Sequence, residues 1–140
     1  MIVCTFFGHK DTPFSIKEAL KQEIIKLIEE EAVDVFWVGN NGAFDLIVQQ
    51  TLEEVRLTKS EINYYIVLSS HGEKAISGNI ENTVLPEELV KSLPKFAISK
   101  RNELMIKSSK YAVCYFKKRF SNCEKWVKLC EKRGLSIVFL

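Results

Sequence analysis

The sequence predicts an α/β protein built on a doubly wound, mainly parallel sheet with helices on both faces. Two patterns along the chain lead to this fold class. Short apolar runs alternate with longer segments whose apolar residues recur at helical spacing. The apolar runs are continuous, which is typical of parallel strands covered on both faces. The length of 140 residues, with 46% hydrophobic and 27% charged residues, fits a single globular domain over residues 1–140.

The first half of the chain is expected to form three strands and two helices. The apolar run Ile2–Phe7 predicts the first strand. The segment Ser15–Glu31 has helical spacing, and Ser15 and Glu18 have the spacing of a capping box. The next elements are expected to be a strand, a helix and a strand over Asp34–Val38, Phe44–Val55 and Asn63–Ser69.

The second half begins with a polar, glycine-containing stretch over residues 70–93, where a short helical turn is expected after Pro86. Gly134 is placed to end the last helix, because the residue just past a helix end often has a positive φ. Right-handed crossovers then give a Rossmann-like sheet of five strands in the order 3-2-1-4-5. The remaining elements are expected to be a helix, a strand, a helix and a strand over Ile98–Ser108, Tyr111–Phe116, Asn122–Lys132 and Leu135–Leu140.

The net charge of +2 hides an uneven distribution along the chain. Residues 1–90 hold 7 Lys and Arg against 15 Asp and Glu, whereas residues 91–140 hold 13 against 3. A basic C-terminal part indicates an anionic partner, although many of these lysines are equally well explained as solvated helix faces. Nucleic acid is the least favoured such partner, because no nucleic-acid-binding module is recognisable.

The four cysteines, Cys4, Cys114, Cys123 and Cys130, form no C-x-x-C pair and are expected to pack in the core as reduced thiols. No metal site is expected, because the two histidines lie far from them in sequence, and no cofactor is indicated. No apolar run approaches the roughly 20 residues that span a bilayer, so no membrane association is expected. The N-terminus lacks the basic stretch of a signal peptide, which favours a cytoplasmic location.

The most informative stretch is Val35–Val48, where four apolar residues lead into the loop Gly39-Asn40-Asn41-Gly42 and then into an amphipathic segment. A loop between a buried strand and a helix favours phosphate, because the first N–H groups of the helix are unpaired and lie at the positive end of its dipole. Glycine lets a ligand approach the backbone closely. The motif is shorter than the dinucleotide fingerprint, so alone it is a weak signal.

In a doubly wound sheet, ligands bind beyond the carboxyl ends of the strands where the strand order reverses, here between the first and fourth strands. Four segments are expected to converge there, together with Ser99–Asn102: Gly8–Asp11, Gly39–Gly42 with Asp45, Ser69–Gly72 and Lys117–Asn122. Glycines, basic residues and amides in one place suit a phosphate or nucleotide. The residues expected to bind it are Gly8, His9, Lys10, Gly39, Asn40, Gly42, Asp45, Arg101, Asn102, Ser121 and Asn122.

Several of these residues allow a second interpretation. His9 is a candidate general acid or base, and equally a ligand contact or a turn cap. Asp45 either compensates the dipole of the helix it begins or accepts a hydrogen bond from a ligand. The cluster Lys117-Lys118-Arg119 either binds phosphate by charge or is simply solvated. For Arg101, ligand contact is favoured, because it is expected near the N-terminal end of a short helix that faces the cleft.

Three segments, in this order, resemble a bacterial family within the SLOG superfamily: Gly8–Asp11, Val38–Asp45 and Pro94–Ile106. These proteins are Rossmann-like and are related to the cytokinin-activating phosphoribohydrolases and to the DNA-processing protein A fold. The resemblance covers nearly the whole chain. It implies binding of a nucleotide or nucleotide-derived small molecule, in a sensor or regulatory role. The related phosphoribohydrolases form dimers, so a homodimer is a candidate state.

The phosphoribohydrolase branch cleaves the N-glycosidic bond of nucleoside 5′-monophosphates, and Arg101-x-x-x-Met105 resembles its active-site arginine motif. The branch carries a Pro-Gly-Gly-x-Gly-Thr-x-x-Glu loop where this chain reads Lys117–Lys125, without glycines and with Lys125 in place of the catalytic glutamate. The neighbouring Glu124 would point about 100° away on a helix. A ligand-binding domain is therefore expected first and a nucleotide N-glycosidase second, with Arg101, Glu124 and His9 as catalytic candidates.

Overall fold

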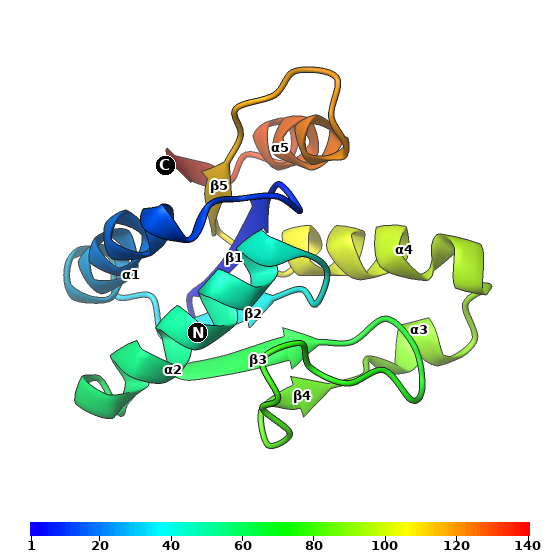
Figure 1. Cartoon of the computed structure of the whole chain (residues 1–140), viewed down its shortest axis with the longest axis horizontal. Helices are drawn as coiled ribbons and strands as arrows, with labels where there is room; N and C mark the ends of the chain where they lie inside the picture. The colour runs from blue at the N-terminus through cyan, green and yellow to red at the C-terminus, as the bar shows by residue number, and fades with distance from the viewer.

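The computed structural model describes residues 1–140 and shows an α/β protein with one sheet of six parallel strands (Figure 1). The strands are β1 (Val3–Gly8), β2 (Val35–Val38), β3 (Asn63–Val67), β4 (Thr83–Val84), β5 (Tyr111–Tyr115) and β6 (Ser136–Phe139). The helices are the 3-10 turn η1 (Phe14–Ile16) and the α-helices α1 (Lys17–Glu31), α2 (Ala43–Thr58), α3 (Glu87–Val90), α4 (Pro94–Lys107) and α5 (Asn122–Lys132).

The strand order is β4-β3-β2-β1-β5-β6, which contains the expected order of five strands and adds a sixth at one edge. The central strand β1 pairs with β2 on one side and with β5 on the other, where Thr5 lies beside Trp37 and Ala112. The additional strand β4 has two residues and pairs with β3. The sequence does not predict β4, because two residues within a polar stretch are too few to show an apolar pattern.

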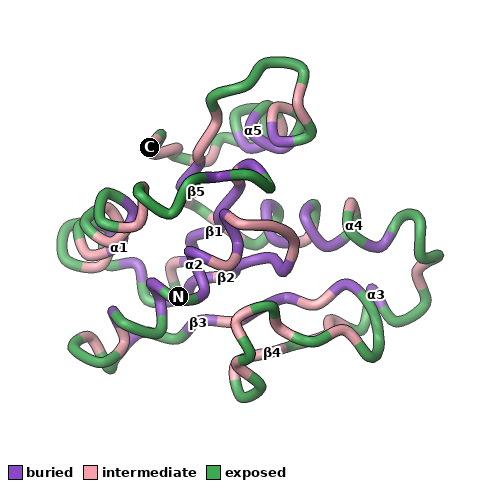
Figure 2. The backbone as a smooth tube through the Cα atoms, viewed as in Figure 1, coloured by how far each residue is buried: buried purple, intermediate pink, exposed green.

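One face of the sheet is covered by α1 and α2, which bury a larger core cluster against β1, β2 and β3 (Figure 2). Leu20 and Ile24 of α1, and Ile47 and Leu52 of α2, are fully buried there. The expected capping box at Ser15 and Glu18 is wrong, because no side chain caps the start of α1 and its N-cap is Ile16. Ser15 lies inside the 3-10 turn η1, whereas a capping residue needs an extended backbone just before the helix.

The other face is covered by α4 and α5, which form a second core cluster with β1 and β5. Helix α4 begins at Pro94, four residues before the expected Ile98, because proline is well suited to the first helical position. Arg101 and Asn102 therefore lie in the middle of α4 and not in its first turn, which corrects the expectation. Helix α5 ends as predicted, with Gly134 in a left-handed conformation at φ 77°.

The four cysteines are unpaired and buried, as the sequence predicts. Three of them, Cys114, Cys123 and Cys130, belong to the core cluster beneath α4 and α5. Burial raises the pKa of the Cys123 thiol to about 11 and that of Cys130 to about 12, so both remain protonated at neutral pH. None of the helices has both the length and the apolar character needed to cross a membrane.

Candidate functional site

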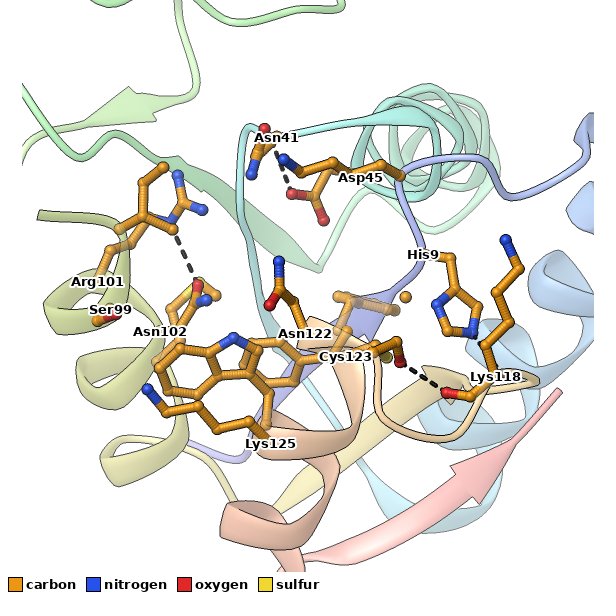
Figure 3. A pocket seen from close by; sticks show the side chains of 18 of the residues that line it. His9, Asn41, Asp45, Ser99, Arg101, Asn102, Lys118, Asn122, Cys123 and Lys125 are labelled. Carbon is orange, nitrogen blue, oxygen red and sulfur yellow. Dashed lines mark hydrogen bonds between the residues drawn. The ribbon is translucent and has the colours of Figure 1, made fainter. Parts of the chain in front are cut away.

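A pocket of about 460 Å³ opens beyond the carboxyl ends of β1 and β5, where the strand order reverses (Figure 3). Its walls come from the loop after β1, the first turn of α2, the middle of α4, the loop after β5 and the first turns of α5. Because the loop after β5 continues directly into α5, these walls come from four segments that are distant in sequence, and they meet at the place where α/β sheets usually bind ligands. The volume lies within the range of small-molecule sites.

Arg101 is the most unusual side chain of this pocket. Its residue is only 2% exposed, yet no carboxylate forms an ion pair with it. The hydrogen bond recorded for the guanidinium is a long one, from Nε to Asn102 Oδ1 at 3.4 Å. Burial lowers the pKa of Arg101, and the charges of Asp45 and Glu73 oppose this shift. Arginine still stays charged, so a nearly unpaired cation lines the pocket.

Asp45 faces Arg101 from the first turn of α2. Both side chains lie against Gly39, where a Cβ atom would be 2.8 Å from Asp45 Oδ2 and 3.3 Å from Arg101 Nη2. Asp45 Oδ2 accepts a hydrogen bond from the Asn41 backbone N–H at 2.8 Å. Burial raises the pKa of Asp45 to about 6, against the opposing effects of Arg101 and the Asn41 N–H group. The carboxyl group is therefore largely ionised at pH 7 and titrates just below it.

His9 lines the opposite side of the pocket, beside Lys118 (Figure 3). Its Nε2 accepts hydrogen bonds from the backbone N–H groups of Lys117 and Lys118 at 2.9 and 3.2 Å. Burial and the Lys118 charge lower the pKa of His9, while Asp11 raises it. The ring is thus neutral at pH 7, with Nε2 engaged in binding the loop after β5.

The charges along the pocket wall are mainly positive. Lys10, Arg101, Lys118 and Lys125 line it, against the two carboxylates Asp11 and Asp45. Asp11 forms an ion pair with Lys118, and Lys125 Nζ lies 4.7 Å from the centre of the Trp126 ring. Amide and hydroxyl groups of Asn41, Ser99, Asn102, Ser121 and Asn122 complete the polar lining. An anion with several hydrogen-bonding groups fits this wall.

The structure brings most of the predicted binding residues to this pocket. Eight of them line it: Gly8, His9, Lys10, Asp45, Arg101, Asn102, Ser121 and Asn122. Gly8 also needs to be glycine for packing, because a Cβ atom there would lie 2.2 Å from the ring of Phe44. Contact of these residues with a ligand remains a prediction.

Three predicted binding residues, Gly39, Asn40 and Gly42, do not line the pocket. Gly39 lies behind Asp45 and Arg101, as described above. Asn40 holds the loop after β3 in place. Its Nδ2 group donates hydrogen bonds to Glu73 Oε2 and to the Lys74 carbonyl oxygen. Its Oδ1 accepts hydrogen bonds from the Ile76 N–H group and from Gln49 Nε2. Gly42, at φ 96°, packs against the Lys10 backbone.

Two N–H groups of the glycine loop and the start of α2 already have hydrogen-bond partners within the protein. The Ala43 N–H group donates to the Lys10 carbonyl at 2.9 Å. The Asp45 carboxylate occupies the Asn41 N–H group and places a negative charge in the first helical turn. The glycine loop therefore supports the pocket wall and positions Asp45, and binding of phosphate by the loop remains a prediction.

The remaining candidates also lie away from the pocket. The segment Ser69–Gly72 and the catalytic candidate Glu124 are not among its lining residues. Glu124 forms an ion pair with Lys128 one turn along α5, at 3.6 Å. Of the cluster Lys117-Lys118-Arg119, Lys118 alone lines the pocket.

Sequence reasoning missed the contribution of α5 beyond its first residues. Lys125 and Trp126 line the pocket, and Met105 of α4 does so from the opposite wall. Lys125 and Trp126 lie three and four residues after Asn122, which places them on the same side of a helix. Helical spacing from Asn122 was therefore the signal that identifies them.

No group of three or more histidine, cysteine or acidic side chains in the structure is arranged to hold a metal ion. No protein-family model matches the sequence, and no curated protein is significantly similar to it. The chemical properties of the pocket are therefore inferred from the residues that line it.

Proposed function

We propose that this protein binds a nucleotide or a nucleotide-derived small molecule in the pocket between α4 and α5. The proposal rests mainly on one observation: the guanidinium group of Arg101 is buried and faces the pocket without an ion-pair partner. Removing a charge from water is costly unless an opposite charge compensates it. An anionic group of a ligand provides that compensation, and phosphate accepts two parallel hydrogen bonds from arginine.

The rest of the pocket supports a nucleotide over a bare anion. Trp126, which is 8% exposed, lines the pocket and gives its wall an apolar part that a base can contact. Asn102 and Asn122 offer amide groups that hydrogen-bond to sugar hydroxyls or base edges. A volume of about 460 Å³ has room for more than a single phosphate.

The resemblance to the SLOG superfamily supports the same proposal, since nucleotide-derived ligands are the theme of that superfamily. A sensor or regulatory role then fits better than catalysis, because Glu124 lies outside the pocket. Four unpaired, buried cysteines support a reducing compartment such as the cytoplasm.

The test is a thermal-shift screen with nucleoside monophosphates, ADP-ribose and cyclic nucleotides. A ligand at 100 times its Kd stabilises the folded state by about 2.7 kcal/mol, which is readily measured. We expect at least one compound to raise Tm. Arg101→Ala is expected to abolish the shift, whereas Arg119→Ala, which removes an arginine outside the pocket, is expected to keep it. A folded wild-type protein that responds to no compound would contradict the proposal.

A nucleotide N-glycosidase is the second candidate, and Asp45 is the observation that favours it. Asp45 lines the pocket, and burial raises its pKa to about 6, a value suited to proton transfer near neutral pH. Such a reaction would transfer a proton to the leaving base while water attacks the anomeric carbon. Incubating each bound nucleoside monophosphate with wild-type protein and with Asp45→Asn, and measuring free base, distinguishes a hydrolase from a binder.

A further inference from the structure

The bonding of His9 shows what this residue does in the fold. Its Nε2 accepts hydrogen bonds from two consecutive backbone N–H groups, those of Lys117 at 2.9 Å and Lys118 at 3.2 Å. Both belong to the loop that leads from β5 to α5. A nitrogen that accepts from two donors carries no proton, so the proton of the neutral ring is on Nδ1.

The His9 ring is itself held in place. The residue is 6% exposed, and its ring meets the edge of Tyr115 at 5.9 Å and lies 6.3 Å from the ring of Phe116, centre to centre. Its carbonyl oxygen accepts hydrogen bonds from the Thr12 hydroxyl at 2.6 Å and the Thr12 N–H group at 3.2 Å. The acceptor therefore faces the loop from a fixed position.

Lys118 connects His9 to the start of α5 through hydrogen bonds. Its N–H group binds His9, its ammonium group pairs with Asp11, and its carbonyl accepts a hydrogen bond from Ser121 Oγ at 2.7 Å. Ser121 is the N-cap of α5, and Ser121 and Asn122 line the pocket. The contacts run without a break from His9 through Lys118 to the first turn of α5 (Figure 3).

We infer that His9 is a positioning residue: as a neutral acceptor it fixes the loop between β5 and α5, and protonation of its Nε2 releases that wall of the pocket. The effect on ligand binding rests on the proposed function, whereas the fixing of the loop is a property of the free protein. In this state Nε2 of His9 is engaged with the loop and is not free to act as a general base.

The charges around His9 determine the direction of the pH effect. From the loop after β5, the Lys118 ammonium faces the ring along with two N–H donors, and from the loop after β1 Asp11 faces it. Tyr115 of β5 meets the ring as well. Because burial and Lys118 outweigh Asp11, the pKa of His9 in the folded protein is lowered. The contribution of His9 to stability is therefore complete above the ordinary histidine pKa and is lost as the pH falls from there through the lowered pKa of the folded protein.

The test measures hydrogen exchange at the Lys117 and Lys118 amides by NMR, in wild type and three variants. His9→Leu removes the acceptor, His9→Gln keeps an uncharged oxygen acceptor, and His71→Gln is the control at an exposed histidine outside the pocket. At pH 7.5, we expect His9→Leu to reduce the protection factors of both amides about tenfold. The control keeps wild-type protection.

A series of pH values distinguishes two explanations for the role of His9: positioning of the loop by a ring that titrates, and packing that does not depend on pH. In wild type, protection of the two amides relative to the amides of α5 falls as the pH is lowered from 7.5 through the lowered pKa of His9, whereas in His9→Gln it stays constant. Ring ¹⁵N shifts of wild type at pH 7.5 are expected to show a protonated Nδ1 and an unprotonated Nε2. If His9→Leu does not fold, the comparison of wild type with His9→Gln decides alone, and equal pH profiles would overturn the inference.

A binding arm keeps this inference distinct from the proposed function. With 5′-AMP and inorganic phosphate as probes, His9→Leu is expected to weaken any binding about tenfold and His71→Gln to leave it unchanged. If wild type binds neither probe nor any nucleotide of the screen, the proposed function fails while the exchange result stands. If protection in His9→Leu equals that of wild type, the positioning inference fails whatever binds.

Discussion

Asp45 and Arg101 both lie against Gly39 and line one pocket, both buried, without forming an ion pair. The sequence places these residues 56 positions apart, on α2 and α4. Each bears a charge that the other compensates only partly. This arrangement makes the pocket sensitive to changes at Gly39, at either charge and at the loop that surrounds them.

Substituting Gly39 tests whether the space between the two charges matters for binding. In Gly39→Ala the new methyl group would lie 2.8 Å from Asp45 Oδ2 and 3.3 Å from Arg101 Nη2, so both side chains must shift. We expect ligand affinity to fall roughly tenfold or more, with a destabilisation of about 1–3 kcal/mol. Calorimetric titration and urea denaturation measure the two effects. Wild-type affinity in Gly39→Ala would show that Asp45 and Arg101 act independently of their spacing.

Removing the charge of Arg101 is expected to stabilise the free protein. Replacement of a poorly paired buried charge by an apolar side chain of similar length removes its desolvation cost, so Arg101→Met is expected to raise the unfolding free energy by roughly 1 kcal/mol. The same variant is expected to lose the ligand binding proposed for the pocket. Urea denaturation without ligand checks the first statement and a thermal shift with ligand the second. A less stable Arg101→Met protein would mean that the guanidinium is structural.

The titration of Asp45 is expected to make stability depend on pH between about 4 and 6. Because burial raises the pKa of Asp45 to about 6, the folded state holds a proton that the unfolded state has already lost in this range. Unfolding free energy therefore falls as the pH rises from 4 to 6, by at most about 3 kcal/mol for this group.

Asp45→Asn isolates this contribution, because the amide oxygen still accepts the Asn41 N–H bond and does not titrate. Urea denaturation at pH 4, 5, 6 and 7 is expected to show the variant gaining stability relative to wild type as the pH rises. A difference that does not change with pH would show that Asp45 titrates at its ordinary value. Anion binding is expected to weaken over the same interval as Asp45 ionises.

Asn40 is expected to matter for stability more than for ligand contact. Three of its hydrogen bonds join it to Glu73, Lys74 and Ile76 in the loop after β3, and a fourth comes from Gln49 of α2. Asn40→Ala leaves several of their partners unsatisfied and is expected to cost about 2–3 kcal/mol. Limited proteolysis should then cut within residues 70–82 faster than in wild type. A loss of ligand affinity with unchanged stability would instead restore Asn40 as a direct contact.

The order of the main elements could be predicted from the sequence, because it depends on local patterns. Val35–Val38 and Tyr111–Tyr115 are continuous apolar runs, and their burial on both faces follows from that pattern. The strand order follows from right-handed crossovers, and it places Gly8, Arg101 and Asn122 at one end of the sheet. The two-residue strand β4 and the start of α4 at Pro94 escaped prediction, because short elements and helix boundaries have weak local signals.

The sequence by itself therefore determined the α/β fold, the buried cysteines and the edge of the sheet where the pocket lies. Tertiary structure alone decided the role of individual residues at and near this edge. In the structure, Asn40 holds the loop after β3, Gly42 packs against the Lys10 backbone, and His9 accepts hydrogen bonds from backbone N–H groups. The physical reason is that a polar side chain bonds to whichever donor or acceptor the fold brings near it, and those partners lie as far as 109 residues away.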